Sequence, residues 1–433
     1  MKRNIIASLM LLLSAGAYAQ SGTNSPYSQY ALGELSEQSG SFSRGMNGLA
    51  YGLRLSNQLN AMNPASYSAL DSLSFIFDAG VGLQLTNFEE GGHKRNANNA
   101  DIDYVVGGFR LCKRVGLSFG LLPYTNVGYD YSNSAHINSS TSPDSPTATY
   151  LNAYSGSRGI HQVYVGVGAE VVDNFSVGLN ASYIWGGYTR NVTNSYSDTY
   201  VNTLRRVYKA DVRSYKLDLG LQYTLPLNKR DELTLGLVYG LGHSLNSDPE
   251  MLVISNNSQT AVADTASFQL KDALDLPHSL GVGVLYNHNG QLMVGADYLL
   301  QKWGKLDYPQ FSEATNSYEL QNGLLKDRHK LTLGVDYCRG ERYRGLLNRL
   351  HYRAGVGYAT PYFKVNGQDG PKEISASVGL GIPIVNAYNN RSMLNISAQW
   401  VRRAASGLLT ENTFRINIGF TFNERWFAKF KVE

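Results

Sequence analysis

The clearest feature of the sequence is an alternation of apolar residues with polar residues or glycine, repeated about fourteen times between Leu73 and Phe422. In the last repeat the apolar positions are Phe414, Ile416, Ile418, Phe420 and Phe422. Successive side chains of a β-strand point to opposite faces, so each repeat predicts a strand with one apolar and one polar face. Many such strands in one chain predict an all-β fold, a transmembrane antiparallel β-barrel of about 14 strands.

The predicted strands are bounded by turn residues and alternate between long and short connections. They cover 73–87, 102–113, 115–131, 160–171, 174–190, 206–224, 231–242, 277–288, 291–302, 327–338, 349–359, 372–384, 392–403 and 412–422. The long connections are 88–101, 132–159, 191–205, 243–276, 303–326 and 360–371. Alternation of this kind is typical of long external loops and short periplasmic turns. Residues 138–149 (NSSTSPDSPTAT) predict a mobile, solvated loop.

The ends of the chain predict three further parts. Residues 1–19 read as a signal peptide, with Lys2 and Arg3 before an apolar run and an A-x-A cleavage site. Residues 20–72 do not alternate and are too apolar in places for a free tail. They are predicted to form a plug, or hatch, inside the lumen of the 73–422 barrel, because an unfilled lumen of this width would leak. Residues 423–433 predict a periplasmic tail that either anchors at the membrane interface or docks a partner.

Composition supports an outer membrane location and argues against other classes. The 30 tyrosines suit aromatic girdles at the membrane interfaces, and the 44 glycines suit tight turns and a crowded lumen. The net charge of +4 is small for 433 residues and is not clustered, so no nucleic-acid partner is expected. Cys112 and Cys338 fall on distant strands, which predicts two free thiols.

Motifs for catalysis or for cofactor binding were sought and not found. The eight histidines show no H-E-x-x-H or H-x-x-x-H spacing, and there is no G-x-S-x-G elbow or P-loop. The sequence therefore predicts no catalytic residue, no metal site and no cofactor. An enzyme site at the outer rim, with His161 as its one candidate, is the alternative.

Several stretches resemble a known family. They are 25–35 (SPYSQYALGEL), 44–54 (RGMNGLAYGLR), 63–75 (NPASYSALDSLSF) and 423–427 (NERWF). Together with the fourteen strands, the motif Asn63-Pro64-Ala65 at the end of the plug resembles the FadL/TodX-type outer membrane transport proteins, in their Bacteroidota branch. The resemblance implies a hatch, a ligand pocket beside it and a lateral opening at a kinked strand. Pro123 cannot donate a ladder hydrogen bond and is the candidate for that wall gate, with a harmless bulge as the alternative.

The predicted lumen departs from that family because it is markedly charged. The inward register carries Asp78, Arg110, Lys216, Asp218, Asp297, Lys330, Asp336, Arg353 and Arg415. A channel for fatty acids needs an apolar pocket with few polar anchors. We interpret the charges as pairs that pin the hatch, since unpaired charges in a crowded lumen would be costly; an ion or sugar path is the alternative.

These patterns favour one function and leave a second as the alternative. The first is passive uptake of hydrophobic small molecules, of the fatty-acid or aromatic-hydrocarbon type, across the outer membrane of a Gram-negative bacterium. Its partners would be outer membrane lipid and the hydrophobic ligand. The second is a non-transporting accessory subunit of a protein secretion or barrel-assembly machine, with another envelope protein as partner.

Overall fold

The wall of the protein is a closed ring of antiparallel strands, seen in a computed structural model that describes residues 22–137, 148–198, 200–312, 315–340, 343–385 and 391–424. Four of the eighteen strands in the main sheet (β1, β5, β11 and β12) branch off the ring, and the other fourteen close it. Closure occurs where β2 pairs with β24 on one side and β3 on the other. The chain is therefore a 14-stranded antiparallel β-barrel, as predicted.

The fourteen wall strands each overlap one predicted strand. They are β2 (Phe75–Glu90), β3 (His93–Cys112), β4 (Val115–Asn126), β6 (Ala148–Val172), β7 (Phe175–Tyr196), β8 (Thr203–Pro226), β9 (Asp231–Gly240), β14 (Ser279–His288), β15 (Leu292–Gln301), β18 (Arg328–Tyr337), β19 (His351–Ala359), β22 (Lys372–Val385), β23 (Arg391–Ala404) and β24 (Thr410–Glu424). Apolar residues on their outer face are solvent-exposed in the isolated chain, for example Leu235 at 43% and Ile418 at 39%. That exposed band is the lipid-facing surface.

Several predicted external loops are instead continuations of the wall. β2 and β3 run on as a hairpin through 88–101, and β7 and β8 extend through most of 191–205. These extensions are polar on both faces. The alternation of apolar and polar residues therefore ends before the hydrogen bonds between the strands end. The predicted strand 115–131 is divided into β4 and β5 (Tyr129–Ile137), and β24 continues past Phe422 to Glu424.

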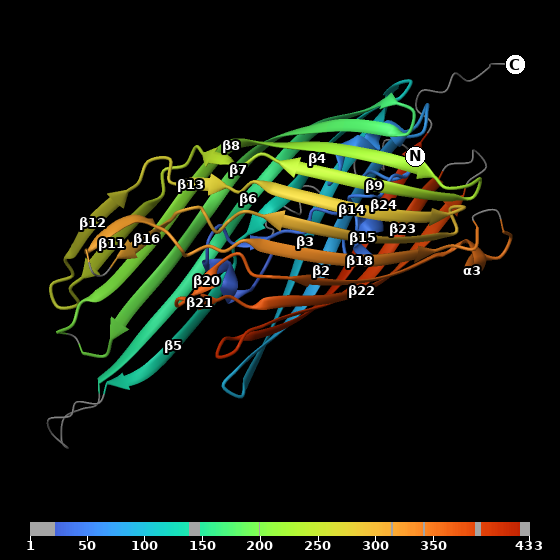
Figure 1. Cartoon of the computed structure of the whole chain (residues 1–433). Helices are drawn as coiled ribbons and strands as arrows, with labels where there is room; N and C mark the ends of the chain where they lie inside the picture. The colour runs from blue at the N-terminus through green and yellow to red at the C-terminus, as the bar shows by residue number, and fades with distance from the viewer. Residues whose placement is uncertain are drawn as a thin grey trace, which may run out of the picture.

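Further short elements cover the end of the barrel where the predicted long connections lie, called the outer end below. They are β10 (His243–Leu245), β11 (Glu250–Asn256), β12 (Ala263–Gln269), β13 (Leu274–Leu276), β16 (Tyr308–Ser312), β17 (Ser317–Gln321), β20 (Lys364–Val365) and β21 (Gln368–Asp369). Figure 1 shows β5, β11, β12 and β16 beyond one end of the ring, and helix α3 (Leu346–Arg349) at the other. No helix in the described parts of the chain is long and apolar enough to cross a membrane.

Residues 22–72, called the N-terminal segment below, contain η2 (Pro26–Gln29), β1 (Glu34–Leu35), α2 (Ser41–Arg44) and η3 (Pro64–Ala69). η3 contacts β4, β6, β7 and β8, whereas α2 contacts β2, β22, β23 and β24. The wall residues that meet this segment, such as Asp78 and Tyr104, alternate with the exposed apolar ones. The contacts therefore lie on the lumen face of the wall, and the segment is drawn in blue in Figure 1.

Three predictions fall wholly or mostly outside the described residues, and a fourth concerns the two thiols. The signal peptide 1–19 and most of the tail 423–433 lie outside the described residues, as do 138–147 of the predicted mobile loop. Cys112, which is exposed, and Cys338, which is buried, are both free thiols, as predicted.

Candidate functional site

The motif Asn63-Pro64-Ala65 begins η3 and joins the N-terminal segment to the wall. The Asn63 side chain caps η3 by accepting from the Ala65 amide at 3.2 Å. Its amide group donates to the backbone oxygens of Tyr51 (2.8 Å) and Leu221 (3.2 Å). A side chain at Gly178 on β7 would collide with the backbone of Pro64, so this glycine allows the close approach. The motif thus acts as a structural joint that is fully buried at Asn63.

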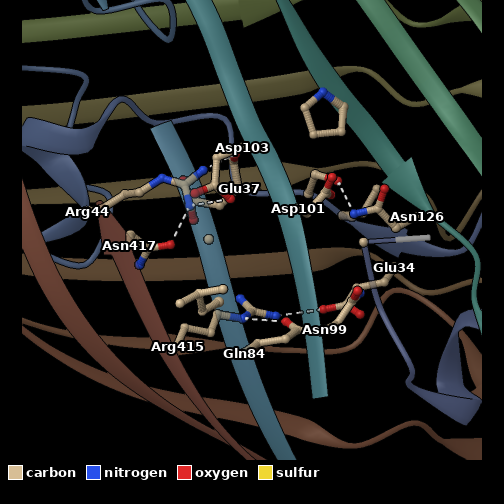
Figure 2. A pocket seen from close by; sticks show the side chains of 16 residues that line it. Glu34, Glu37, Arg44, Gln84, Asn99, Asp101, Asp103, Asn126, Arg415 and Asn417 are labelled. Atoms are coloured by element: carbon tan, nitrogen blue, oxygen red, sulfur yellow. Dashed lines mark hydrogen bonds and ion pairs between the residues drawn. The ribbon is translucent and has the colours of Figure 1, made fainter. Parts of the chain in front are cut away.

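An ion cluster centred on Glu34 of β1 connects the segment to β23 and β24. Its carboxylate accepts from Arg403 at 2.7 Å and from Arg415 at 3.0 Å, as Figure 2 shows for Arg415. Burial raises the pKa of Glu34, but the two guanidinium groups outweigh burial and bring that pKa down to about 2. Arg403 also pairs with Glu373 at 2.9 Å and Glu411 at 3.6 Å. The cluster therefore joins one residue of the N-terminal segment to three wall strands, β22, β23 and β24.

A second pair of charges holds the chain just after β1. Glu37 accepts from Lys330 of β18 at 2.7 Å. Burial raises the pKa of Glu37, but the ammonium group outweighs it and the pKa falls to about 2. Arg44 of α2 pairs with Asp103 of β3 at 2.9 Å and donates to Asn417 of β24 at 2.9 Å. Figure 2 shows Glu37, Arg44, Asp103 and Asn417 around a common pocket.

The nine predicted lumen charges fall into three groups. Asp78, Asp297, Lys330 and Arg415 contact the N-terminal segment. Lys216 and Asp218 pair with each other, as do Asp336 and Arg353 (2.8 Å), although Arg353 also touches the segment. Arg110 lies apart near the strand end, where its guanidinium donates to the Cys112 carbonyl at 3.3 Å.

Two of these wall charges hold backbone and aromatic groups of the segment. One Asp297 oxygen accepts from the amides of Ala50 (2.6 Å) and Tyr51 (2.9 Å). The Arg353 guanidinium lies over the Phe42 ring of α2, 3.8 Å from its centroid. Such contacts fix position without needing an opposite charge on the segment.

Sequence reasoning missed Glu34, Glu37, Arg44 and Arg403. The signal for Arg403 was present, because it shares the inward register of Asn395 and Ser397 on the same strand. The other three lie in the N-terminal segment, whose strand and helices are too short for a period to indicate which side chains face the wall.

The outer mouth is filled by an apolar cluster that combines the N-terminal segment with the external elements. Tyr27 packs against Phe363 with ring centroids 6.2 Å apart, and Trp303 packs against Tyr362 at 4.8 Å. Trp303 is 1% exposed. Arg190 closes the cluster by donating to the Ala31 carbonyl at 2.5 Å. The described part of the outer end therefore has a packed core in place of an open vestibule.

Small cavities remain between the N-terminal segment and the wall. One of about 100 Å³ is lined by charged residues that include Arg328, Lys330 and Glu373. Another of about 130 Å³ has a mixed lining that includes Met62, Leu122 and the Lys216–Asp218 pair. Both are smaller than the 300–1,000 Å³ usual for a ligand pocket.

The wall is interrupted between β3 and β4, near the predicted gate. The β3–β4 ladder ends at Val105 opposite Leu121, and the β4–β6 ladder shifts register between Pro123 and Thr125. Beyond that point β4 pairs with β1 of the N-terminal segment. A cavity of about 60 Å³ lies at the interruption, lined by β1, β2, β3 and β4, and is the pocket in Figure 2.

The one candidate for other chemistry, His161, lies opposite Pro123 in the β4–β6 ladder. His161 is exposed on β6, beside the Trp185 ring at 6.0 Å. Among the described residues no three His, Cys, Asp or Glu side chains are grouped so as to hold a metal ion.

Comparison with solved structures finds the same fold in outer membrane channels. The Pseudomonas putida toluene transporter TodX is 15% identical, with a TM-score of 0.60 over 91% of this chain and 100% of that one. The Ralstonia pickettii toluene transporter TbuX is 15% identical, with a TM-score of 0.59 over 89% and 98%. A Pseudomonas aeruginosa FadL homologue is 13% identical, with a TM-score of 0.60 over 91% and 99%. The predicted resemblance to FadL/TodX-type proteins is thus confirmed at the level of fold.

Comparisons of sequence give a different family label. No curated protein matches the chain. The model of a family described as BamG matches residues 1–433.

Proposed function

This chain belongs to the BamG family, and from that premise we propose that it is a non-transporting accessory subunit of the barrel-assembly machine in the outer membrane of a Gram-negative bacterium. The family label, which differs from that of the hydrocarbon channels, supports this role. In this proposal residues 1–19 are a signal peptide, residues 20–72 are a fixed hatch and residues 423–433 are a periplasmic tail that docks a partner.

The observation that carries the proposal is the way the lumen is filled. Opening it would separate Glu34 from Arg403 and Arg415, and Glu37 from Lys330. Removing one partner of a buried ion pair costs about 3–5 kcal/mol. The outer membrane has no ATP to supply this free energy. Movement of the ligand down its concentration gradient would have to supply it in every transport cycle. A lumen built this way suits a rigid scaffold better than a channel.

Passive uptake of a hydrophobic small molecule is the second candidate. It is supported by the fold shared with TodX and TbuX and by the apolar residues Met62, Leu122 and Leu299 in the lining of the 130 Å³ cavity. In this case Pro123 would mark a lateral exit. The charged cavities beside Lys330 are the feature that opposes it.

Affinity purification from native membranes in mild detergent tests the choice. The accessory role predicts that other envelope proteins are recovered at near-stoichiometric amounts and are absent from a control barrel of similar abundance. Recovery of the barrel alone, together with faster uptake of toluene or oleate into liposomes than into empty vesicles, would reverse the order of the two candidates.

A further inference from the structure

The interruption in the wall leaves one long strand edge unpaired. β3 pairs with β2 along its length, from His93 to Phe109. It pairs with β4 only from Val105 to Cys112. Within the described chain, residues 93–104 of β3 therefore have no strand on the side facing β4. Figure 1 shows the β2–β3 hairpin and β5 running to separate tips on either side of this interruption.

The hydrogen bonds identify which backbone groups face the gap. The Asn98 carbonyl accepts from the Asn24 side chain at 3.0 Å. The amides of Ala100 and Ile102 donate to the side-chain oxygens of the residues before them, Asn99 (2.9 Å) and Asp101 (2.8 Å). Donor and acceptor of one residue lie on the same edge of an antiparallel strand. The even-numbered residues thus present their backbone groups to the gap. There the amides of Ala100 and Ile102 donate to the side chains of Asn99 and Asp101.

The pocket beside this edge has an excess of carboxylates. Its lining includes four acids, Glu34, Glu37, Asp101 and Asp103, and two bases, Arg44 and Arg415. Glu34 and Glu37 have cations from the wall, as described above. Asp103 pairs with Arg44 at 2.9 Å through one oxygen, and its other oxygen is buried without a hydrogen-bond partner. Within the described residues Asp101 has no cation within 4.0 Å. Figure 2 shows both aspartates on β3, directed at the pocket.

We propose that the edge of β3 from His93 to Tyr104 accepts an extended segment of a partner protein as an added strand, with a Lys or Arg side chain of that segment placed between Asp101 and Asp103. This inference rests on the proposed accessory role and names the docking site. An unpaired edge binds an extended polypeptide through main-chain hydrogen bonds, and adjacent pockets select its side chains. A hydrocarbon would satisfy neither the strand edge nor the two carboxylates.

The test uses the full-length protein in its native membrane with three variants. Ala100→Pro removes a gap-facing amide, and because that amide is not bonded to β2 the β2–β3 ladder is kept. Ala100→Ser is the matched control that keeps the amide. Asp101→Lys reverses the charge in the pocket. Folding of each variant is verified by the heat-dependent gel shift of the barrel.

Photo-crosslinking from position 100, with outward-facing Leu83 of β2 as the control position, identifies the occupant by peptide sequencing. We expect a single cross-linked segment that carries a Lys or Arg, at least tenfold lower partner recovery for A100P and D101K, and wild-type recovery for A100S. Exchanging that partner residue for Glu restores recovery with D101K.

Three outcomes overturn the inference. They are wild-type partner recovery with folded A100P, cross-links only to lipid or an apolar small molecule, and cross-links only to residues 20–24 of the same chain. A partner that stays bound to A100P contradicts only the docking site. A wild-type protein that recovers no partner contradicts the accessory role as well.

Discussion

Replacing Glu34 by Gln is the sharpest perturbation of the lumen, because Gln keeps the shape of the side chain and removes its charge. The pKa of Glu34 falls from 4.5 to about 2 through its contacts with Arg403 and Arg415, although burial opposes the shift. That shift corresponds to about 3 kcal/mol of preference for the ionised form. E34Q should therefore weaken the docking of the N-terminal segment by about 3 kcal/mol, which is about a hundredfold in its open population.

Hydrogen–deuterium exchange of the peptide covering residues 33–38 measures this effect. We expect its protected amides to exchange about a hundredfold faster in E34Q, with wall peptides unchanged. Glu89→Gln is the control, because Glu89 forms an exposed pair with Lys94 at 3.8 Å worth about 0–1 kcal/mol. Exchange in E34Q within threefold of wild type would refute the claim that this ion cluster holds the segment.

The same carboxylate predicts a dependence on pH. Because the folded-state pKa of Glu34 lies below its unfolded value of 4.5, its stabilising contribution is complete above about pH 4.5 and is lost as the pH falls through about 2. After correction for the intrinsic exchange rate, the wild-type peptide should lose protection across that range and E34Q should lose less. Equal losses in the two proteins would assign the acid sensitivity to other groups.

Four further changes test the register, a buried pair and the tail. Leu235→Arg on the lipid face should lower the free energy of unfolding by about 2–4 kcal/mol. Gly236→Ala should disturb only the N-terminal segment, because the added Cβ would overlap the backbone of that segment. Equal effects of the two changes on barrel unfolding in urea would contradict the register. Asp336→Asn leaves the 1%-exposed Arg353 side chain unpaired and should destabilise the barrel by about 3–5 kcal/mol in the same assay. Deleting 425–433 should leave the gel shift intact and abolish partner recovery; retained recovery would exclude the tail as a docking element.

The wall could be predicted from the sequence because lipid imposes a period of two on every strand that crosses it. Where the strands leave the membrane that constraint ends. β6 begins at Ala148, twelve residues before the predicted start at 160. The prediction began late because both faces of the strand are polar over those residues. The ladder continues because backbone hydrogen bonding does not depend on side-chain polarity.

The charged lumen could be predicted only in part, for a related reason. Register indicates which face a side chain occupies, so Asp297 and Arg415 were assigned inward correctly. Register does not give the position of a residue along the barrel axis when the strands are tilted, and it does not give the path of the N-terminal segment. The Glu34–Arg403 contact joins residues 369 positions apart, and no local pattern links them.

The central claim is that the barrel works as an assembled subunit and not as a passage for small molecules. The most direct measurement is mass spectrometry of the protein purified from its native membrane in mild detergent, analysed for both co-purifying proteins and organic extracts, against a control barrel. We predict near-stoichiometric envelope proteins and no enriched apolar compound. A near-stoichiometric hydrocarbon or fatty acid with no protein partner would contradict the claim and identify the barrel as a transporter.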